Sequence, residues 1–485
     1  MSNFANVIRN ITNQTLSENG GIVYKSTGGG ALLDLFATIG GMRHQPINEV
    51  IVKWRKAYKE NPILAANLIL YTRDIRNGGI GERAIARALL RELATIEPEK
   101  IKRNLNTIIS CGRWDDLFVL LDIKQIKADV ISLITEQLTE DMKNMRANKP
   151  ISLLAKWAPS INTSSRETRR IANLICNELG LTPKTYRKTL ASLRKYMSVV
   201  ERQMSDGEWS KINFEAVPSL AMSRYNKAYR KHTPIEFQAY LESLQKGTAK
   251  INAATLNPTD ICKKYFNHRR LETTDIAQWG SLPNYVRGEN EVVIMADVSG
   301  SMTWPNYEPI AASIGLATYF AQRNKGSYHG MYLTFTDTPH FVNLDDDWDI
   351  ERCFKFVENK GIGYNTNMDG AFRAIYDVAV ATHDSPKALV VISDGEMDSW
   401  VRSSQSQSIV SKWKEKFNAR GLDFPRVISW NVACRNGTVI APASDGVSFV
   451  SGYGAGPFKN LVELIELNAE EAMIKILTKP EFTWK

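Results

Sequence analysis

The chain has 485 residues, of which 43% are hydrophobic and 23% are charged, a composition typical of a globular protein with two or three domains. It has no run of 18 apolar residues and no apolar signal-peptide segment near its start, so we expect no membrane association and a cytoplasmic location. Its five cysteines are widely spaced and form no Cys-x-x-Cys pair, which argues against a zinc site and against a disulfide framework.

The net charge of +9 conceals two halves of opposite sign. Residues 286–485 contain 19 Lys and Arg against 25 Asp and Glu, a net of −6, so residues 1–285 hold 42 basic and 27 acidic residues, a net of +15. A basic half of this kind suggests a polyanionic partner. A solvated helical surface rich in Lys and Arg accounts for the same charge equally well.

Helical periodicity runs through nearly all of residues 1–285. Apolar side chains recur every three or four residues in ten segments: 47–61, 62–76, 82–96, 98–110, 113–121, 128–146, 166–179, 183–200, 217–232 and 233–245. Short breaks such as Asn77-Gly78-Gly79 separate them. Successive helices of this length favour an α-solenoid of paired, HEAT-like helical repeats, with a compact helical bundle as the alternative.

From about residue 282 onward the sequence alternates strands with helices. We predict strands at 291–296, 330–335, 388–392 and 426–431, and helices at 308–323, 369–383, 404–420, 458–467 and 469–477. Such alternation implies a mostly parallel sheet with helices on both faces, an α/β Rossmann-like domain. We therefore expect a multidomain protein, with a helical domain at 1–285 and an α/β domain at 286–485.

The sequence VVIMADVSGSM at 292–302 places oxygen ligands directly after a buried strand. Asp297, Ser299 and Ser301 share a loop at the C-terminal end of that strand, where open α/β sheets bind ligands. Hard oxygen donors suit Mg²⁺ or another divalent cation. No histidine or activated nucleophile accompanies them, so we expect a binding site and no enzyme activity, with metal-assisted hydrolysis as a weaker alternative.

This pattern resembles the metal-ion-dependent adhesion site of a von Willebrand factor A domain. The resemblance implies a second metal loop in GIGYNTNM at 361–368, through Thr366, and a third after the strand in KALVVISDG at 387–395, through Asp394. With Asp297 and Asp394 as its only carboxylate ligands, the cation would stay electrophilic and would accept an acidic group from a partner. A Rossmann-like domain without a metal is the alternative reading.

Segments in both halves also match one family. They are MADVSGSM at 295–302, NTNMDGAF at 365–372, VVISDGEMD at 390–398, VSGYGAGPFKNLVELI at 450–465, TGGGALLDLFATIGGMR at 27–43, LILYTRDIRNGGIGER at 68–83, CGRWDDLF at 111–118 and SLLAKWAPS at 152–160. In these segments and in its two-part layout, the chain resembles the TROVE-module proteins, the family of the Ro autoantigen. The resemblance implies a ring or horseshoe of HEAT-like helices closed by the A-type domain. One departure is Asn365, which stands where Ro proteins have glycine.

RNA binding needs cations for phosphates and flat side chains for unstacked bases. Basic residues cluster between 166 and 270, with Tyr186, Tyr196, Tyr225 and Tyr229 interleaved. Our candidate RNA contacts are Arg166, Arg169, Arg170, Lys184, Arg187, Lys188, Arg224, Lys227, Arg230, Lys231, His232, Lys263 and Lys264. For any single cluster, the alternative is an exposed basic helix face whose tyrosines pack inward.

The family resemblance implies an RNA-binding ring protein of the Ro type. Such a protein holds small noncoding, Y-like RNA and single-stranded RNA ends, as a ribonucleoprotein in RNA quality control. The alternative is a metal-dependent protein-interaction scaffold that captures an acidic group of a partner protein. We expect Mg²⁺ or another divalent cation as the cofactor, and a monomer in solution.

Overall fold

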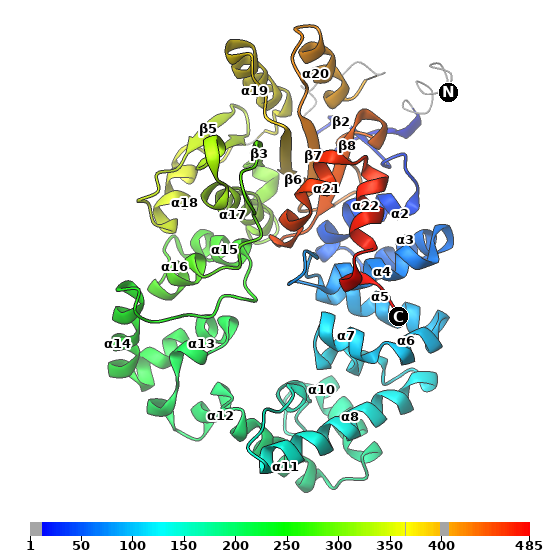
Figure 1. Cartoon of the computed structure of the whole chain (residues 1–485), viewed down its shortest axis with the longest axis vertical. Helices are drawn as coiled ribbons and strands as arrows, with labels where there is room; N and C mark the ends of the chain where they lie inside the picture. Colours follow the sequence, from blue (N-terminus) through cyan, green and yellow to red (C-terminus); the bar gives the residue numbers. More distant parts are fainter. Residues whose placement is uncertain (1–11, 364, 398–406) are drawn as a thin grey trace. The chain divides into compact units, whose positions relative to one another are not determined.

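The structure, a computed structural model, describes residues 12–363, 365–397 and 407–485 (Figure 1). The chain divides into two compact units. The first comprises Met1–Ile85 and Ala253–Thr483, and the second comprises Ala86–Asn252 with Trp484–Lys485. The chain therefore leaves the first unit, forms the second and returns, whereas the sequence analysis placed one boundary after residue 285.

A six-stranded sheet forms the centre of the first unit, in the order β5-β4-β3-β6-β7-β8. Its strands are β3 Val292–Asp297, β4 Met331–Phe335, β5 His340–Asn343, β6 Ala388–Ser393, β7 Arg426–Asn431 and β8 Val447–Ser451. All neighbours pair in parallel except β4 and β5, which are antiparallel. The mostly parallel sheet was predicted and is confirmed. The strands β5 and β8 were missed, because β5 is only four residues long and β8 carries two serines.

Strand β3 lies between β4 and β6, and the crossovers on its two sides run in opposite directions along the sheet. From β3 the chain passes through α17 (Glu308–Arg323) to β4, and later through α19 (Met368–Thr382) to β6 and α20 (Ile409–Asn418) to β7. Because such crossovers are right-handed, α17 covers one face while α19 and α20 cover the other. The carboxyl ends of β3 and β6 therefore flank a topological switch point, where open α/β sheets bind ligands.

Two helices from outside the predicted α/β domain complete this unit. Helix α2 (Ala31–Thr38) packs on β7 and β8, and its Phe36 carbonyl accepts a hydrogen bond of 3.2 Å from Ser451 Oγ. Helix α15 (Pro258–His268) lies along α17, where a Cβ on Gly315 would meet the Pro258 backbone at 3.1 Å. The sheet unit thus takes its apolar cover from chain segments that come before and after the second unit. This explains why the boundary expected after residue 285 falls inside this unit.

The remaining elements of the first unit surround this core. They are β1 Gln14–Leu16, β2 Ile22–Tyr24, α3 Ile47–Glu60, α4 Pro62–Arg73, α16 Thr273–Gly280, α18 Ile350–Asn359, α21 Leu461–Glu466 and α22 Ala469–Leu477. The helix predicted at 404–420 begins at Ile409 in the structure, and residues 404–406 lie outside the described ranges.

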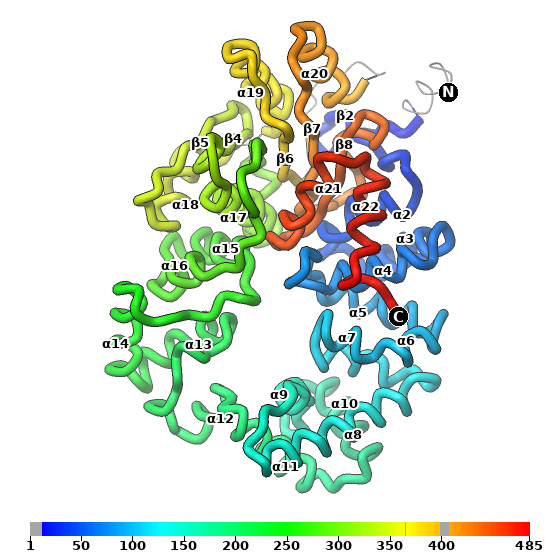
Figure 2. The backbone as a smooth tube through the Cα atoms, in the orientation of Figure 1, coloured from blue at the N-terminus to red at the C-terminus, as the bar shows by residue number. Residues whose placement is uncertain are grey.

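The described residues of the second unit are mainly helical, and Figure 2 traces their path. The helices are α5 Arg83–Ile96, which begins in the first unit, α6 Pro98–Arg103, α7 Leu105–Cys111, α8 Lys124–Arg146, α9 Leu154–Trp157, α10 Arg166–Glu178, α11 Pro183–Tyr196, α12 Val200–Ser205, α13 Ser219–His232 and α14 Pro234–Gln245. Consecutive helices pack together, α10 with α11 and α13 with α14. The α-solenoid stays a prediction.

Two helix predictions in this unit were too long. The segment 98–110 is interrupted at Asn104, whose side chain donates a hydrogen bond of 2.8 Å to the Lys100 carbonyl. The segment 113–121 forms two 3₁₀ turns, Trp114–Asp116 and Phe118–Leu120, because Asp116 accepts a hydrogen bond from the Arg113 amide. No helix in the described ranges has both the length and the apolarity needed to cross a bilayer.

Candidate metal centre and nucleic-acid interface

Three loops of the first unit meet at the carboxyl ends of the central strands. Asp297 is the last residue of β3 and Asp394 follows the last residue of β6, so the parallel pairing of these strands brings both carboxylates to one edge. The loop that carries Thr366 joins them through a hydrogen bond of 3.3 Å from the Gly363 amide to the Val298 carbonyl. A Cβ on Gly363 would lie 1.7 Å from Thr336 Oγ1, so glycine permits this close approach. The three predicted metal loops therefore converge.

Hydrogen bonds fix the orientation of the two carboxylates. Asp297 Oδ1 accepts from the Ser299 amide at 2.9 Å, and its Oδ2 accepts from Ser393 Oγ at 2.6 Å. Asp394 Oδ1 accepts from the Glu396 amide at 3.0 Å. The hydroxyls of Ser299 and Ser301 lie 3.1 Å apart. These oxygens are therefore held in place by the backbone and by one serine.

Both carboxyl groups are buried close to one another, which disfavours their charged forms. Burial raises the pKa of Asp297 to about 7, and the neighbouring charge of Asp394 adds to this shift. Burial likewise raises the pKa of Asp394. Among the described residues, Asp394 Oδ2 has no hydrogen-bond partner although it is buried. Two buried carboxylates, one with a free oxygen, beside serine and threonine hydroxyls are a donor set that fits a hard divalent cation.

The described part of the chain contains no metal site built from cysteine or histidine clusters. No group of three or more His, Cys, Asp and Glu side chains gathers there in a way that would hold a metal. Asn365 donates its side-chain amide to the Asp337 carboxylate, and its backbone carbonyl accepts a hydrogen bond of 3.0 Å from Thr336 Oγ1. Asn365 thus ties the second loop to the end of β4. Tyr364, just before it, lies outside the described residues.

Two further residues touch this centre and were missed by the sequence analysis. Ser393 holds Asp297, as described above, and accepts a hydrogen bond of 3.1 Å from the Gly395 amide. Arg435, in the loop after β7, donates to the Ser301 carbonyl at 2.6 Å and lies 3.6 Å from Asp394 Oδ2. Ser393 lies within the third metal-loop segment but was not singled out, and Arg435 belongs to no recognisable motif, because only the pairing of β6 with β3 and of β7 with β6 brings them here.

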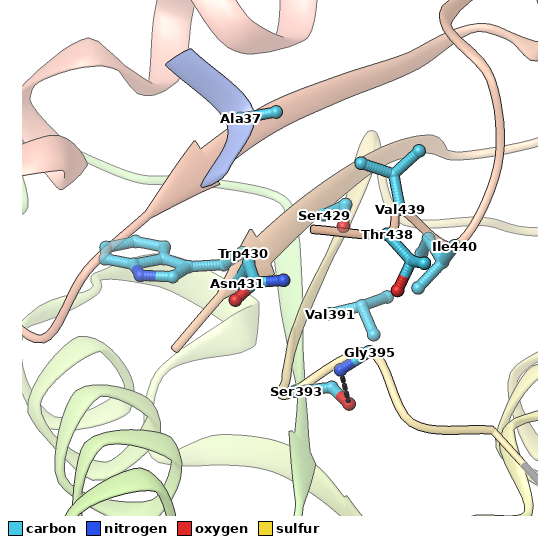
Figure 3. A pocket seen from close by; sticks show the side chains of 10 residues that line it. All are labelled: Ala37, Val391, Ser393, Gly395, Ser429, Trp430, Asn431, Thr438, Val439 and Ile440. Atoms are coloured by element: carbon cyan, nitrogen blue, oxygen red, sulfur yellow. Dashed lines mark hydrogen bonds between the residues drawn. The ribbon is translucent and has the colours of Figure 1, made fainter. Parts of the chain in front are cut away.

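A small cavity lies next to the third loop (Figure 3). It is lined by Ala37, Val391, Ser393, Gly395, Ser429, Trp430, Asn431, Thr438, Val439 and Ile440. The Ser393 hydroxyl is already bonded to Asp297 and Gly395, and the Asn431 side chain accepts a hydrogen bond of 3.1 Å from the Ala433 amide. These polar groups therefore hold the sheet edge together and leave little capacity to bind a ligand.

The positive charge of the chain is concentrated in the second unit. Residues 86–252 contain 28 Lys and Arg against 18 Asp and Glu, a net of +10, and the rest of the chain holds 33 against 34, a net of −1. The following predicted RNA contacts are exposed: Arg166, Arg169, Lys184, Arg187, Lys188, Arg224, Lys227, Arg230, Lys231 and His232.

Helical spacing explains why these cations are exposed. On α11 the buried side chains are Tyr186, Leu190 and Leu193, so Lys184, Arg187 and Lys188 face away from the core. On α13 the buried side chains include Met222 and Tyr229, so Arg224, Lys227 and Lys231 lie on the opposite side. Each helix therefore presents a row of cations three or four residues apart.

Three predicted RNA contacts are instead engaged in ion pairs. Arg170 bonds to both Glu167 and Asp122 at 2.8 Å. Lys263 pairs with Glu308 at 2.9 Å and Lys264 pairs with Asp275, both within the first unit. Their acidic partners are distant in sequence or on the next helical turn. These ion pairs neutralise side chains that were predicted to contact RNA.

Two of the four interleaved tyrosines pack inward, while Tyr225 is half-buried and Tyr196 is exposed. Tyr186 is buried and donates to the Pro159 carbonyl at 2.9 Å, and Tyr229 is buried against Phe214 and Phe237. A different ring pair is present. The half-buried Trp209 stacks on the exposed His232, with ring centroids 4.4 Å apart and planes inclined by 14°. No sequence pattern indicated this pair, since the two rings come from different elements.

Comparisons with known proteins find relatives without an assigned function. Residues 121–287 match the family model "Domain of unknown function (DUF2828)", and residues 291–481 match "Domain of unknown function (DUF7788)". The chain is also similar to the uncharacterized protein L728 of Acanthamoeba polyphaga mimivirus, at 27% identity over 510 residues, which span 96% of this chain and 88% of that protein.

Among solved structures, the chain is similar to the crystal structure of the Deinococcus radiodurans RO (RSR) protein. The match covers 92% of both chains at 12% sequence identity, with a TM-score of 0.35. A TM-score at this level does not establish a common fold.

Proposed function

We propose that this chain is an RNA-binding protein of the Ro type, with a helical unit that holds RNA by its phosphates. The observation that carries this proposal is the set of exposed cations on α10, α11 and α13, within residues 86–252, which have a net charge of +10. Cations at helical spacing match a phosphate backbone better than they match scattered acidic side chains. Small noncoding RNA and single-stranded RNA ends are the proposed ligands, in keeping with the family resemblance of the sequence.

The stacked pair Trp209 and His232 supports the same proposal. Unpaired bases bind to exposed flat side chains, and His232 directly follows Arg230 and Lys231 on α13. A surface that is only solvated has no need of an exposed, stacked ring such as His232 beside its cations. The combination therefore favours RNA over a general affinity for anions.

Salt dependence tests this proposal. Binding of a single-stranded RNA to the full chain, measured by fluorescence anisotropy, is expected to weaken steeply between about 50 and 200 mM salt. The log–log slope should amount to several units, at about 0.7 for each neutralised phosphate. An affinity that is flat across this range would overturn the proposal.

We also propose a second function for the first unit, which is a divalent-cation centre like that of a von Willebrand factor A domain. Asp297, Ser299, Ser301, Thr366 and Asp394 would hold the ion, with Mg²⁺ as the expected cation. Bound there, the cation would supply a positive centre for an acidic group of a partner protein. The supporting observation is the buried Asp297–Asp394 pair at the switch point of the sheet. Calorimetric titration of the full chain with MgCl₂ tests the site, and no heat of binding at millimolar concentration would overturn it.

A further inference from the structure

The guanidinium of Arg435 lies beside the candidate metal centre and is tied to it at two points. Its Nη2 donates to the Ser301 carbonyl at 2.6 Å and lies 3.6 Å from Asp394 Oδ2. Its Nη1 lies 3.3 Å from the carboxylate of Glu18, which is 54% exposed, whereas the Arg435 side chain is only 19% exposed. The stronger electrostatic partner of this mostly buried cation is therefore the buried Asp394.

Charge at the sheet edge would be poorly balanced without Arg435. Asp297 and Asp394 are both buried, and Glu396 two residues further on is a third buried carboxylate. Glu396 is turned away from the pair, since its Oε2 accepts from the Glu18 amide at 2.6 Å and its Oε1 accepts from Asn436 at 3.4 Å. Buried carboxylates without a counter-charge are costly. Arg435 supplies the counter-charge that reaches the oxygen of Asp394 that has no hydrogen bond.

We propose that Arg435 is the resident counter-cation of the Asp297–Asp394 pair, and that it lowers the affinity of this centre for divalent cations. This inference rests on the proposed metal centre. A guanidinium 3.6 Å from a metal-ligand oxygen repels an incoming cation. It also neutralises part of the carboxylate charge that would attract this cation. Arg435 thereby sets the concentration at which the metal binds.

A purely structural role for Arg435 predicts the opposite effect. The same side chain also donates to the Trp304 carbonyl at 3.4 Å, and its guanidinium lies 5.6 Å from the Trp304 ring. If its role were to support the loop of Ser299 and Ser301, its loss would disorder these ligands and weaken metal binding. The direction of the change in affinity therefore separates the two roles.

The test uses the full chain with Arg435→Gln, which removes the charge, and Arg435→Lys, which keeps it. Titration calorimetry with MgCl₂ and with MnCl₂ should show at least about tenfold tighter binding for Arg435→Gln than for the unsubstituted chain, from the loss of one nearby like charge. Arg435→Lys should stay close to the unsubstituted chain. Arg352→Gln is the matched control, because Arg352 also lies over a tryptophan ring, that of Trp348, but belongs to α18.

Thermal unfolding provides a readout that does not depend on the titration. In EDTA, Arg435→Gln should melt below the unsubstituted chain, because the carboxylates have lost their counter-charge. Added Mg²⁺ should then raise its Tm by more than it raises that of the unsubstituted chain, since tighter binding stabilises the folded state more. Equal shifts in the two proteins would overturn the proposal.

The remaining outcomes separate this inference from the metal centre itself. Weaker metal binding by Arg435→Gln than by the unsubstituted chain would overturn the counter-cation role and leave the metal centre standing. Binding by both proteins, tighter for Arg435→Gln than for the unsubstituted chain, would support both. No binding by any of the proteins would overturn both.

Discussion

Asp297 meets two opposing demands at the level of a single residue. As a candidate ligand it must be ionised, yet it is fully buried beside Asp394, and these two causes raise its pKa to about 7. Its hydrogen bonds from the Ser299 amide and Ser393 Oγ offset this cost only in part. A residue that lowers stability in order to bind a ligand marks a functional site better than its sequence pattern does.

The substitution Asp297→Asn separates binding from stability. It should abolish Mg²⁺ binding, because it removes one of two charged ligands. In EDTA at pH 8 it should raise the free energy of unfolding by about 1–3 kcal/mol, since an uncharged amide no longer faces Asp394 across a dry site. The sign follows from the raised pKa: the folded state is destabilised by the charged form, which predominates above pH 7.

Urea denaturation measures this change, and calorimetry measures the lost binding. Asp394→Asn is the matched comparison, and it should gain less stability because it leaves Arg435 without its buried partner. A variant Asp297→Asn that retains the metal affinity of the unsubstituted chain would contradict the assignment of this residue as a ligand.

Individual site residues were predictable where the signal is local. Asp297, Ser299 and Ser301 follow one strand at fixed spacing, and the structure brings Asp394 and the loop that carries Thr366 to the same edge of the sheet. Arg435 escaped notice because its contacts with Ser301 span 134 positions of sequence. Lys263 was taken as available for RNA because its partner Glu308 is 45 positions away. Contacts between residues so far apart in sequence depend on the fold, and the composition of the chain does not indicate them.

At the level of elements, α13 offers the sharpest test of the RNA interface. Replacing Arg224, Lys227 and Lys231 by glutamine should weaken RNA binding and reduce the log–log salt slope by about 2 units, since each lost phosphate contact accounts for about 0.7. The helix should survive, because glutamine is a good helix former and its buried residues are unchanged. Fluorescence anisotropy across a salt series measures both quantities.

Lys263→Gln is the control for this experiment. Lys263 is basic and was an equally good candidate by sequence, but it pairs with Glu308, so the RNA salt slope should not change in this variant. If Lys263→Gln reduced the slope as much as the triple substitution of α13, the assignment of the interface to α13 would be wrong.

Elements were predictable in proportion to their periodicity. The helix at 308–323 was predicted with the same bounds that α17 has, because it begins at Glu308-Pro309 and its apolar residues continue to Arg323. The α-helix predicted at 113–121 was wrong, because the apolar residues of this segment belong to two 3₁₀ turns set by Asp116. The unit to which each element belongs was the hardest property to predict. The apolar face of α2 does not indicate that this helix packs on β8, a strand more than four hundred residues later in the chain.

At the scale of the whole molecule, opposite charges separate the two proposed functions. The exposed cation rows lie in the second unit, while the metal loops lie in the first. RNA affinity and its salt slope should therefore be the same in Mg²⁺ and in EDTA at matched ionic strength, and the same for Asp297→Asn as for the unsubstituted chain. Loss of RNA binding on metal removal would mean that RNA phosphates themselves ligate the cation, against a two-site arrangement.

The divided first unit also has a consequence for protein synthesis. Helix α2 ends at Thr38, but the strand it covers, β8, begins at Val447. At about 5–20 residues per second, the ribosome completes β8 some tens of seconds after α2 has emerged. During that time α2 can pack on α3 and α4, where Phe36 stacks on Tyr71, but its face toward β7 and β8 lacks its native partner. This chain is therefore expected to depend on chaperones during translation, and chaperone occupancy on nascent chains shorter than residue 447 measures that dependence.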